Sequence, residues 1–298
     1  MVAEGDEGFN YGTIKAIGGD GTTALQLSQQ REFVNHGSIV ASLAGGASGT
    51  TVGLAYTSSS WGSTFINYGL VSGTKAIEGY DPYGRPERGN FYNFGRIEGS
   101  ITLANGDGWF ENAGVVVGDV RLGAGTNAWF GSGGEHRGSV AGGDGTDLLI
   151  GSAGIDTLSG ENGNDYIRGG RGGDRLSGGE GRDVFVYGLA GESTAAAPDK
   201  IDGFVSGVDR IDLSALDVQS ISLTPDAGFT RLDAVTAAGT LTIRIVGTVS
   251  KTDLILARRA SIDGTPTADF LVATDGGSVV RAGAGDDVLI GSADADRL

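Results

Sequence analysis

The sequence contains no cysteine and only five prolines among its 298 residues. Without cysteine no disulfide holds the fold together, although this absence alone does not identify the cellular compartment. Because 56 glycines accompany the few prolines without any Gly-X-Y period, collagen is excluded and a plain linker is disfavoured. A glycine-rich chain of this kind is expected to consist of repeats with many tight turns.

Basic stretches and long apolar runs are also missing. The formal net charge is −16, and without a basic stripe the chain has nothing to displace the counterions of a phosphate backbone, which argues against nucleic acid and anionic membranes as partners. Cations are the expected partners. No apolar run is long enough to span a membrane, and MVAEGDEGFN at the start has no signal-peptide pattern, so any export signal lies elsewhere.

An Asn-x-Gly pattern recurs five times in the first part of the chain. Each copy has Gly two residues after Asn and Ile or Val four residues after it, usually with an aromatic residue two positions before the Asn. Short alternating runs between the copies, such as TTALQL, read as strands. The copies are FNYGTI (9–14), FVNHGSI (33–39), FINYGLV (65–71), FYNFGRI (91–97) and FENAGVV (110–116).

We predict an all-β fold that begins with a right-handed parallel β-helix over residues 1–141, because such coils bury an inner face only by stacking. In this arrangement the asparagines form an internal amide ladder, the glycines supply a positive φ angle, and the phenylalanines stack beneath. A sugar site built from the asparagines is the less favoured interpretation. The residues concerned are Asn10, Asn35, Asn67, Asn93 and Asn112, then Gly12, Gly37, Gly69, Gly95 and Gly114, and finally Phe33, Phe65, Phe91 and Phe110. The pattern resembles the β-helical stalks of filamentous haemagglutinins and autotransporter passengers.

Residues 142–186 run in five strict nonapeptides. Position six is Asp in every copy, and position eight is Leu, Ile or Phe. Because side chains alternate along a strand, a three-residue strand centred on position eight points one apolar side chain inward, while the six preceding residues make the turn. Two nonapeptides then complete one coil, so aspartates two repeats apart stack on the same edge. One stack contains Asp147, Asp165 and Asp183, and the opposite stack contains Asp156 and Asp174.

This spacing predicts a metal site. Stacked carboxylates ~4.8 Å apart repel one another unless a cation lies between them. Glycines in the turns expose backbone carbonyls, and Ca²⁺ takes six to eight hard oxygen ligands of this kind at about 2.3–2.6 Å. We therefore expect Ca²⁺ as the cofactor, with about three complete sites among the five repeats. A solvated, metal-free linker is disfavoured, because a linker has no reason to keep position eight apolar.

The nonapeptides are similar to the calcium-binding repeats of RTX (repeat-in-toxin) proteins, whose fold is a parallel β-roll. The resemblance implies that backbone carbonyls at the second and fourth turn positions complete the metal coordination. Ser152 and Glu161 depart from the pattern by replacing the second glycine. Before the roll, LGAGTNAWF (122–130) looks like a decayed nonapeptide with Asn127 in place of Asp. The implied carbonyl ligands are Gly143, Gly145, Gly154, Gly163, Gly170, Gly172, Gly179 and Gly181.

Residues 187–281 are expected to form a β cap over the open end of the roll. Within this segment PDKIDGFVSGVDRIDLSALD (198–217) resembles the sequence that follows the roll in serralysin-type metalloproteases. Asp202, Asp209 and Asp212 are interpreted as surface residues and not as a further metal site. The resemblance does not extend to zinc-protease activity, because the two histidines, His36 and His136, form no HExxH motif. We expect His36 at the surface of a coil turn.

AGAGDDVLI (282–290) restarts the nonapeptide with Asp287 as a further metal ligand, so residues 282–298 are predicted to begin a second RTX block. The chain both starts and stops abruptly within a coil. We therefore expect it to be a section of a longer polypeptide. The RTX resemblance further implies type I secretion with an uncleaved C-terminal signal.

These patterns predict a non-catalytic calcium-binding module, secreted or on the cell surface, with a structural or adhesive role and folding outside the cell on Ca²⁺ binding. Its expected partners besides calcium are extracellular polysaccharide or neighbouring repeats of the same protein. The alternative is a polysaccharide-modifying enzyme similar to alginate epimerases, with its site in the loop 79–90. That loop carries Tyr80, Asp81, Tyr83, Arg85, Glu87 and Arg88. The β-helix is short for such an enzyme, and no His accompanies Asp81.

Overall fold

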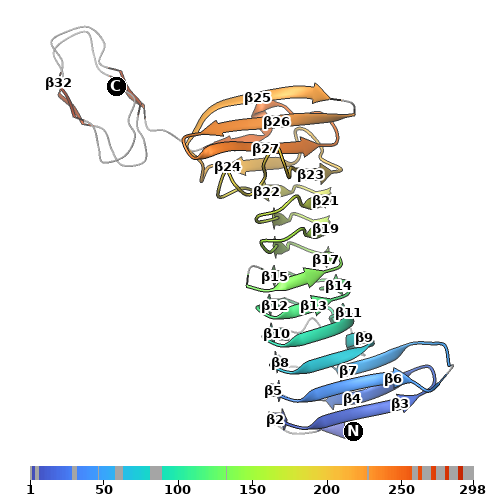
Figure 1. Cartoon of the computed structure of the whole chain (residues 1–298). Helices are drawn as coiled ribbons and strands as arrows, with labels where there is room; N and C mark the ends of the chain where they lie inside the picture. The colour runs from blue at the N-terminus through green and yellow to red at the C-terminus, as the bar shows by residue number, and fades with distance from the viewer. Residues whose placement is uncertain are drawn as a thin grey trace.

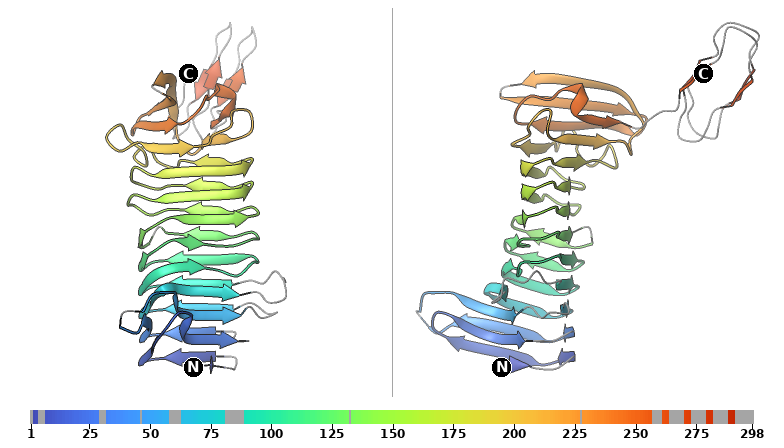
Figure 2. Two further views of the ribbon diagram at one scale, coloured as in Figure 1. Left: turned by 90° about the vertical axis from the view of Figure 1, so that its right-hand side faces the viewer. Right: turned by 180° about the vertical axis from the view of Figure 1, so that it is seen from behind.

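The computed structural model describes residues 2–3, 7–28, 32–45, 47–57, 63–80, 89–131, 133–226 and 228–256, and four short strands between residues 261 and 290. Over these residues the chain is built from β-strands, and the only helix is a 3-10 turn, η1 (Lys251–Asp253). The strands stack as rungs of a long solenoid, from the N-terminal end to an antiparallel sheet at the other end (Figures 1 and 2). The prediction of an all-β fold with parallel coils is confirmed.

One side of the solenoid is a parallel sheet, here called sheet B, that contains eleven strands among the described residues. Its strands pair in chain order, each with the equivalent strand one coil later. They are β2 (Glu7–Asn10), β5 (Glu32–Asn35), β8 (Ser63–Asn67), β10 (Gly89–Asn93), β12 (Gly108–Asn112), β15 (Ala128–Phe130), β18 (Leu148–Ile150), β20 (Tyr166–Arg168), β22 (Val184–Val186), β24 (Arg210–Leu213) and β28 (Leu254–Leu256).

The facing side, sheet A, is parallel along the solenoid and contains seventeen described strands. In the first coils it widens into paired strands that project from the stack, visible at the N-terminal end of Figure 1. Its strands are β1 (Val2–Ala3), β3 (Thr13–Gly18), β4 (Thr22–Ser28), β6 (Ser38–Leu43), β7 (Thr51–Thr57), β9 (Leu70–Tyr80), β11 (Arg96–Thr102), β13 (Val115–Val117), β14 (Val120–Arg121), β16 (Glu135–Arg137), β17 (Val140–Asp144), β19 (Thr157–Gly163), β21 (Arg175–Gly181), β23 (Asp199–Asp202), β25 (Val218–Asp226), β26 (Phe229–Thr236) and β27 (Gly239–Ile245).

The antiparallel strands β25, β26 and β27 lie at the end of the roll. They are attached through β27, which pairs in parallel with β23 and thereby continues sheet A. Sheet B continues in the same way through β24 and β28. Further along the chain, β29 (Ser261–Asp263) pairs with β31 (Val279–Arg281), and β30 (Phe270–Val272) pairs with β32 (Val288–Ile290).

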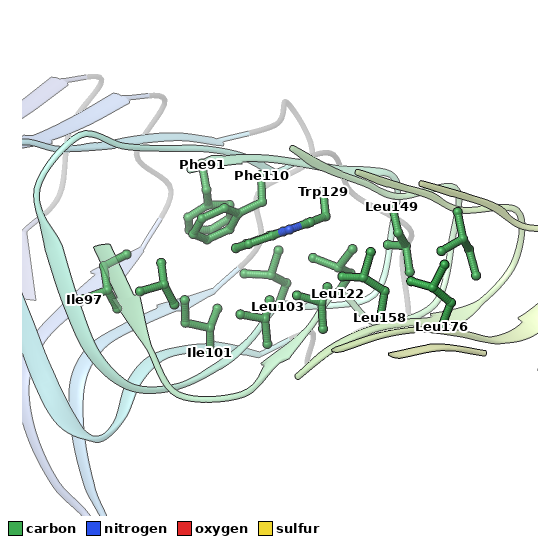
Figure 3. Packing of buried hydrophobic residues seen from close by; sticks show 14 of the residues in the cluster. Phe91, Ile97, Ile101, Leu103, Phe110, Leu122, Trp129, Leu149, Leu158 and Leu176 are labelled. Carbon is green, nitrogen blue, oxygen red and sulfur yellow. The ribbon is translucent and has the colours of Figure 1, made fainter. Parts of the chain in front are cut away.

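The core lies between the two sheets and runs unbroken from the first coils into the roll. Figure 3 shows the aromatic rings of Phe91, Phe110 and Trp129 continuing into the aliphatic row that contains Leu149. Position eight of every nonapeptide points inward, as predicted, since these side chains are 0 or 1% exposed. They are Leu149, Leu158, Ile167, Leu176 and Phe185. The nonapeptide coils, whose core is mostly aliphatic, thus share one hydrophobic core with the preceding coils, whose core contains stacked aromatic rings.

The predicted amide ladder is present at the corner where sheet B turns into sheet A. The Nδ2 of each asparagine donates to the Oδ1 of the next over 2.8 Å, and the central members are completely buried. The rings of Phe33 and Phe65 stack inside the coils at 6.0 Å, and those of Phe91 and Phe110 at 5.8 Å. The ladder comprises Asn10, Asn35, Asn67, Asn93 and Asn112.

The prediction that the following glycines supply a positive φ angle is wrong. Gly12, Gly37, Gly69, Gly95 and Gly114 do not have that conformation. From the second coil on they are required by close approach, because a Cβ on any of these four would overlap the carbonyl oxygen of the equivalent glycine one coil earlier. Stacking distance, and not backbone torsion, selects glycine here.

Candidate metal centre

The nonapeptide aspartates form two buried stacks at opposite corners of the solenoid. In the first stack Asp147 donates its backbone N–H to the Oδ1 of Asp165 over 2.8 Å, and Asp165 donates likewise to Asp183 over 3.0 Å. In the second stack Asp156 donates to Asp174 over 2.9 Å. Each of these hydrogen bonds joins residues eighteen positions apart, and all five carboxylates are 0 or 1% exposed. The structure therefore places the five predicted aspartates in the predicted pairs.

One oxygen of each carboxylate is buried without a hydrogen-bond partner. These orphaned atoms are Asp147 Oδ2, Asp156 Oδ1, Asp165 Oδ2, Asp174 Oδ2 and Asp183 Oδ2. A buried carboxylate oxygen that accepts nothing is costly, because it has lost water without a replacement. Four of the five atoms are the Oδ2 of successive turns in the two stacks, and such a row indicates carboxylates that need a positive partner.

In four of the five nonapeptides the first glycine makes room for that oxygen. A Cβ on Gly142 would overlap the carboxylate of Asp147, and the same holds for Gly160 with Asp165 and Gly178 with Asp183. On the other corner Gly169 lies in the same way against Asp174. The sequence analysis assigns no role to these glycines, although glycine occupies position one in all five repeats.

The carbonyl oxygens at positions two and four lie between successive coils. A Cβ on Gly163 would overlap the carbonyl oxygen of Gly145, and a Cβ on Gly172 would overlap that of Gly154. Most of these glycines adopt φ angles between 95° and 141°, which only glycine takes readily. Those with a positive φ angle are Gly143, Gly145, Gly163, Gly170, Gly172, Gly179 and Gly181. Two rows of carbonyl oxygens therefore accompany each carboxylate stack.

The two departures from the glycine pattern are accommodated differently. Glu161 adopts a φ angle of 77°, which makes it the only non-glycine residue with a positive φ angle among the described residues. The turn of Ser152 changes shape instead, since neither Ser152 nor Gly154 has a positive φ angle. The backbone N–H and the hydroxyl of Ser152 both donate to Asp156 Oδ2, over 2.7 and 2.9 Å. This turn is the first of its stack and supplies its own donors.

Burial dominates the electrostatics of the stacks. Loss of solvent raises the pKa of Asp147 to about 6 and the pKa values of Asp165 and Asp174 to about 7, against the backbone hydrogen bonds that lower them. The neighbouring carboxylates of the stack raise the pKa values of Asp165 and Asp174 further. Burial also raises the pKa of Asp183. The charged form of these acids therefore needs a counter-charge close by.

Asn127 shows which group satisfies the same position in a neutral turn. Its Oδ1 accepts the N–H of Gly108, as the Oδ1 of Asp147, Asp165, Asp174 and Asp183 accepts the N–H of the preceding coil. Its Nδ2 therefore occupies the place of the orphaned aspartate oxygen. From there it donates to the carbonyl oxygens of Gly123 and Gly125, over 3.1 and 3.4 Å. In the Asp147 turn the carboxylate oxygen Oδ2 takes the place of the Asn127 Nδ2 donor. This oxygen cannot donate to the carbonyl oxygens of the turn.

Both stacks extend beyond the nonapeptides into the cap. Asp183 donates its N–H to Asp209 Oδ1 over 3.1 Å, and Asp174 donates to Asp199 Oδ1 over 3.0 Å. Asp199 and Asp209 are 0 and 2% exposed, and burial raises the pKa of Asp199 to about 8. The interpretation of Asp209 as a surface residue is therefore wrong. Sequence reasoning missed both residues because insertions of the cap shift them from the nine-residue period.

Asp202 and Asp212, the other two acidic residues interpreted as surface residues, are partly exposed. Asp202 pairs with Lys200 at 2.6 Å, and Asp212 accepts the N–H of Ser214 at 2.8 Å. His36 is exposed, as predicted, and its ring stacks between those of Tyr11 and Tyr68. Asp287 and residues 81–88 lie outside the described residues, so the predictions about them stand as sequence predictions.

The donor set fits a hard cation. All ligands on offer are carboxylate and carbonyl oxygens, which suit Ca²⁺, whereas nitrogen or sulfur ligands would favour zinc. Within the part of the chain that the structure describes, no three acidic or histidine side chains converge on one point. A cation in these stacks would therefore take one or two carboxylates and draw the rest of its ligands from the backbone.

Comparison with known proteins gives one family. Residues 89–290 match the family model described as Peptidase M10 serralysin C terminal. Among solved structures, the AlgE6R3 subunit of the Azotobacter vinelandii mannuronan C5-epimerase is similar at 29% identity and a TM-score of 0.29, over 38% of this chain and 78% of that chain. The AlgE6R2 subunit of the same organism's enzyme is 24% identical with a TM-score of 0.32, over 40% of this chain and 92% of that chain. No curated protein matches the chain.

Proposed function

Since this chain belongs to the Peptidase M10 serralysin C-terminal family, we propose that it is a calcium-binding structural or adhesive module that folds outside the cell. The two aspartate stacks and the turn carbonyls beside them would hold the metal. Ca²⁺ bound there supplies the positive charge that keeps stacked carboxylates ionised and gives the carbonyl oxygens a shared partner.

The observation that carries this proposal is the contrast between Asn127 and the aspartates in the equivalent position. The Asn127 amide donates to two carbonyl oxygens of its own turn. The equivalent oxygen of Asp147 has no donor and is buried. Asp165, Asp174 and Asp183 repeat this deficiency in register. In the Asp156 turn Ser152 donates to Oδ2, and Oδ1 is the oxygen without a donor.

The extended stacks provide more layers than the five nonapeptides alone. One stack runs through Asp147, Asp165, Asp183 and Asp209, which gives three neighbouring pairs. The other runs through Asp156, Asp174 and Asp199, which gives two. We therefore expect a stoichiometry of up to five ions, above the three expected from the repeats alone.

Calcium dependence accounts for folding outside the cell. Extracellular calcium modules bind at about 10⁻⁴–10⁻³ M, so such sites stay empty at cytosolic calcium levels. A ligand that binds only the folded state stabilises it by about 2.7 kcal/mol per site at 100 times its Kd. The chain would leave the cell before the roll is stable.

Among the described residues no helix has the length and hydrophobicity needed to cross a membrane.

Calcium titration tests the proposal. Isothermal titration with CaCl₂ should give heat from several ions, and EGTA should remove part of the β signal in circular dichroism, restored on adding calcium. Asp147→Ala should lower the stoichiometry by one. Asp144→Ala is the matched control, because Asp144 is an exposed acid in the same turn and removes the same charge. No heat at millimolar CaCl₂, or equal losses in the two variants, would refute the proposal.

The enzymatic alternative rests on the loop 79–90. Its candidate residues from Asp81 to Arg88 lie outside the described residues, and no described contact favours catalysis. It is therefore kept as a sequence prediction and is not proposed here.

A further inference from the structure

The outer face of sheet B carries a groove that calcium binding does not use. It is an open hollow of about 380 Å³ beside the first aspartate corner, and its lining includes residues of five strands of the sheet, from β10 to β20. Within it an aromatic ring stands on β12, at Trp109, and another on β20, at Tyr166; these residues are 41 and 49% exposed. Both side chains belong to one column of the sheet, because Trp109 pairs with Ala128, Ala128 with Leu148, and Leu148 with Tyr166.

The hollow exists because of the small residue in that column. Ala128 stands between the indole of Trp109 and the side chain of Leu148, so it forms a low floor between higher walls. Three coil steps of ~4.8 Å separate Trp109 from Tyr166, which gives a length of roughly 14 Å. A ligand lying along the groove would therefore cross the strands and span several coils.

The indole of Trp109 is held in a fixed orientation. One of its faces stacks on the ring of Phe130, with 4.3 Å between centroids and 29° between planes. The rest of the Trp109 side chain remains accessible, since the residue is 41% exposed and lines the hollow. An aromatic face fixed by its neighbour offers a flat apolar surface at little conformational cost.

Polar groups complete the lining of the hollow. Thr126 and Thr146 are exposed on successive coils, and Asp107 is at the same corner. Asn90 continues the column beyond Trp109. The lining contains no Lys, Arg or His. Flat apolar rings beside hydroxyl, amide and carboxylate groups match the two surfaces of a sugar ring, which has C–H groups on its faces and hydroxyls on its rim.

From this arrangement we propose that the groove binds a neutral hexose polysaccharide in an extended conformation. A uronate chain is disfavoured, because the groove has no cationic side chain and the chain as a whole carries a net charge of −16. The proposal gives the adhesive role proposed above a ligand, and it depends on that function because Asp147 belongs both to the groove lining and to the first metal turn. Ligand binding should therefore require calcium.

The test uses the calcium-saturated full chain and isothermal titration with cellohexaose, laminarihexaose and mannohexaose as neutral probes. Hexaguluronate serves as the anionic comparison. At least one neutral probe should bind, and Trp109→Ala and Tyr166→Ala should each weaken it at least tenfold. Tyr68→Ala is the matched control, since Tyr68 is 50% exposed but lies at an Asn-x-Gly turn outside the groove. It should bind as the parent chain does.

Calcium titration of every variant separates this inference from the proposed function. Normal calcium binding without heat from any neutral probe would overturn the groove assignment alone, as would tighter binding of hexaguluronate or full affinity in Trp109→Ala. Loss of self-association in Trp109→Ala, seen by light scattering without sugar, would assign the face to contacts between copies and would also overturn it. Absence of calcium binding in the parent chain would instead refute the function on which the inference rests.

Discussion

The asparagine ladder and the aspartate stacks solve the same packing problem with different chemistry. Both place one short polar side chain per coil at a buried corner, in register with the coil before and after. In the ladder each amide donates from Nδ2 and accepts at Oδ1, so Asn35, Asn67 and Asn93 satisfy one another at 2.8 Å. In the stacks each carboxylate only accepts. One of its oxygens is therefore left without a partner in every turn.

The comparison teaches that exchanging NH₂ for O converts a self-sufficient solenoid into one that depends on a cation. In a column of amides each side chain both donates and accepts, so the column satisfies its own hydrogen bonds. A column of carboxylates only accepts, and therefore needs a bound cation. Asn127 has an amide at the corner of the first aspartate stack, although its turn already has the glycines of the roll. The hydrophobic core is continuous from the ladder coils into the roll, so the difference is confined to the corners.

Chelation should have the largest effect and should separate the two regions. In EGTA, amide hydrogen exchange of residues 148–186 should lose protection, because several sites each contribute about 2.7 kcal/mol at 100 times their Kd. Residues 89–117 should remain protected, because their ladder needs no ion. Exchange measured by mass spectrometry with and without CaCl₂ checks this. Equal loss in both segments would show that the ladder is not independent of the metal.

Changing the centre of one stack should give opposite effects with and without calcium. Asp165→Asn should remove two layers and cost about 5 kcal/mol in saturating CaCl₂. In EGTA the same variant should protect the roll better than the parent chain, by about 1 kcal/mol, since the new amide finds carbonyl acceptors as Asn127 does. Urea unfolding and exchange protection measure both. A variant weaker than the parent under both conditions would contradict the comparison.

The smallest change should extend the stack upstream. Asn127→Asp should add one calcium ion in isothermal titration, because it would turn the amide turn that precedes Asp147 in the first stack into a carboxylate turn. In EGTA it should cost about 1–3 kcal/mol, since the carbonyl oxygens of Gly123 and Gly125 lose their donor. Asn105→Asp is the control, because Asn105 is exposed on the same corner and its Oδ1 accepts the N–H of Ala124. An unchanged number of bound calcium ions in Asn127→Asp would contradict this prediction.

Much of the candidate site follows from periodicity. A strict period of nine fixed which aspartates stack, and the apolar residue at position eight fixed which way each short strand faces. The period could not find Asp199 and Asp209, because the cap inserts residues before each of them and only the return of the chain brings them under Asp174 and Asp183. The same limit explains the error over Asp209, whose burial depends on the cap.

The glycines divide along the same line. The sequence alone indicated that the roll glycines allow tight turns, and their positive φ angles agree. It could not distinguish them from Gly37 or Gly69, which have ordinary φ angles and are needed because the next coil approaches too closely for a Cβ. The distance between a glycine and the carbonyl oxygen of the preceding coil depends on how two coils pack, and the sequence of either coil alone does not determine it.

By itself the sequence determined the repeat, the facing of each side chain and the choice between amide and acid at each corner, because these depend on local spacing and residue chemistry. Only the tertiary structure decided how far the stacks run, which oxygens are left without donors, and that Trp109, Ala128 and Tyr166 share one groove. Those features arise where coils distant in sequence lie about 5 Å apart, and no local pattern records that contact.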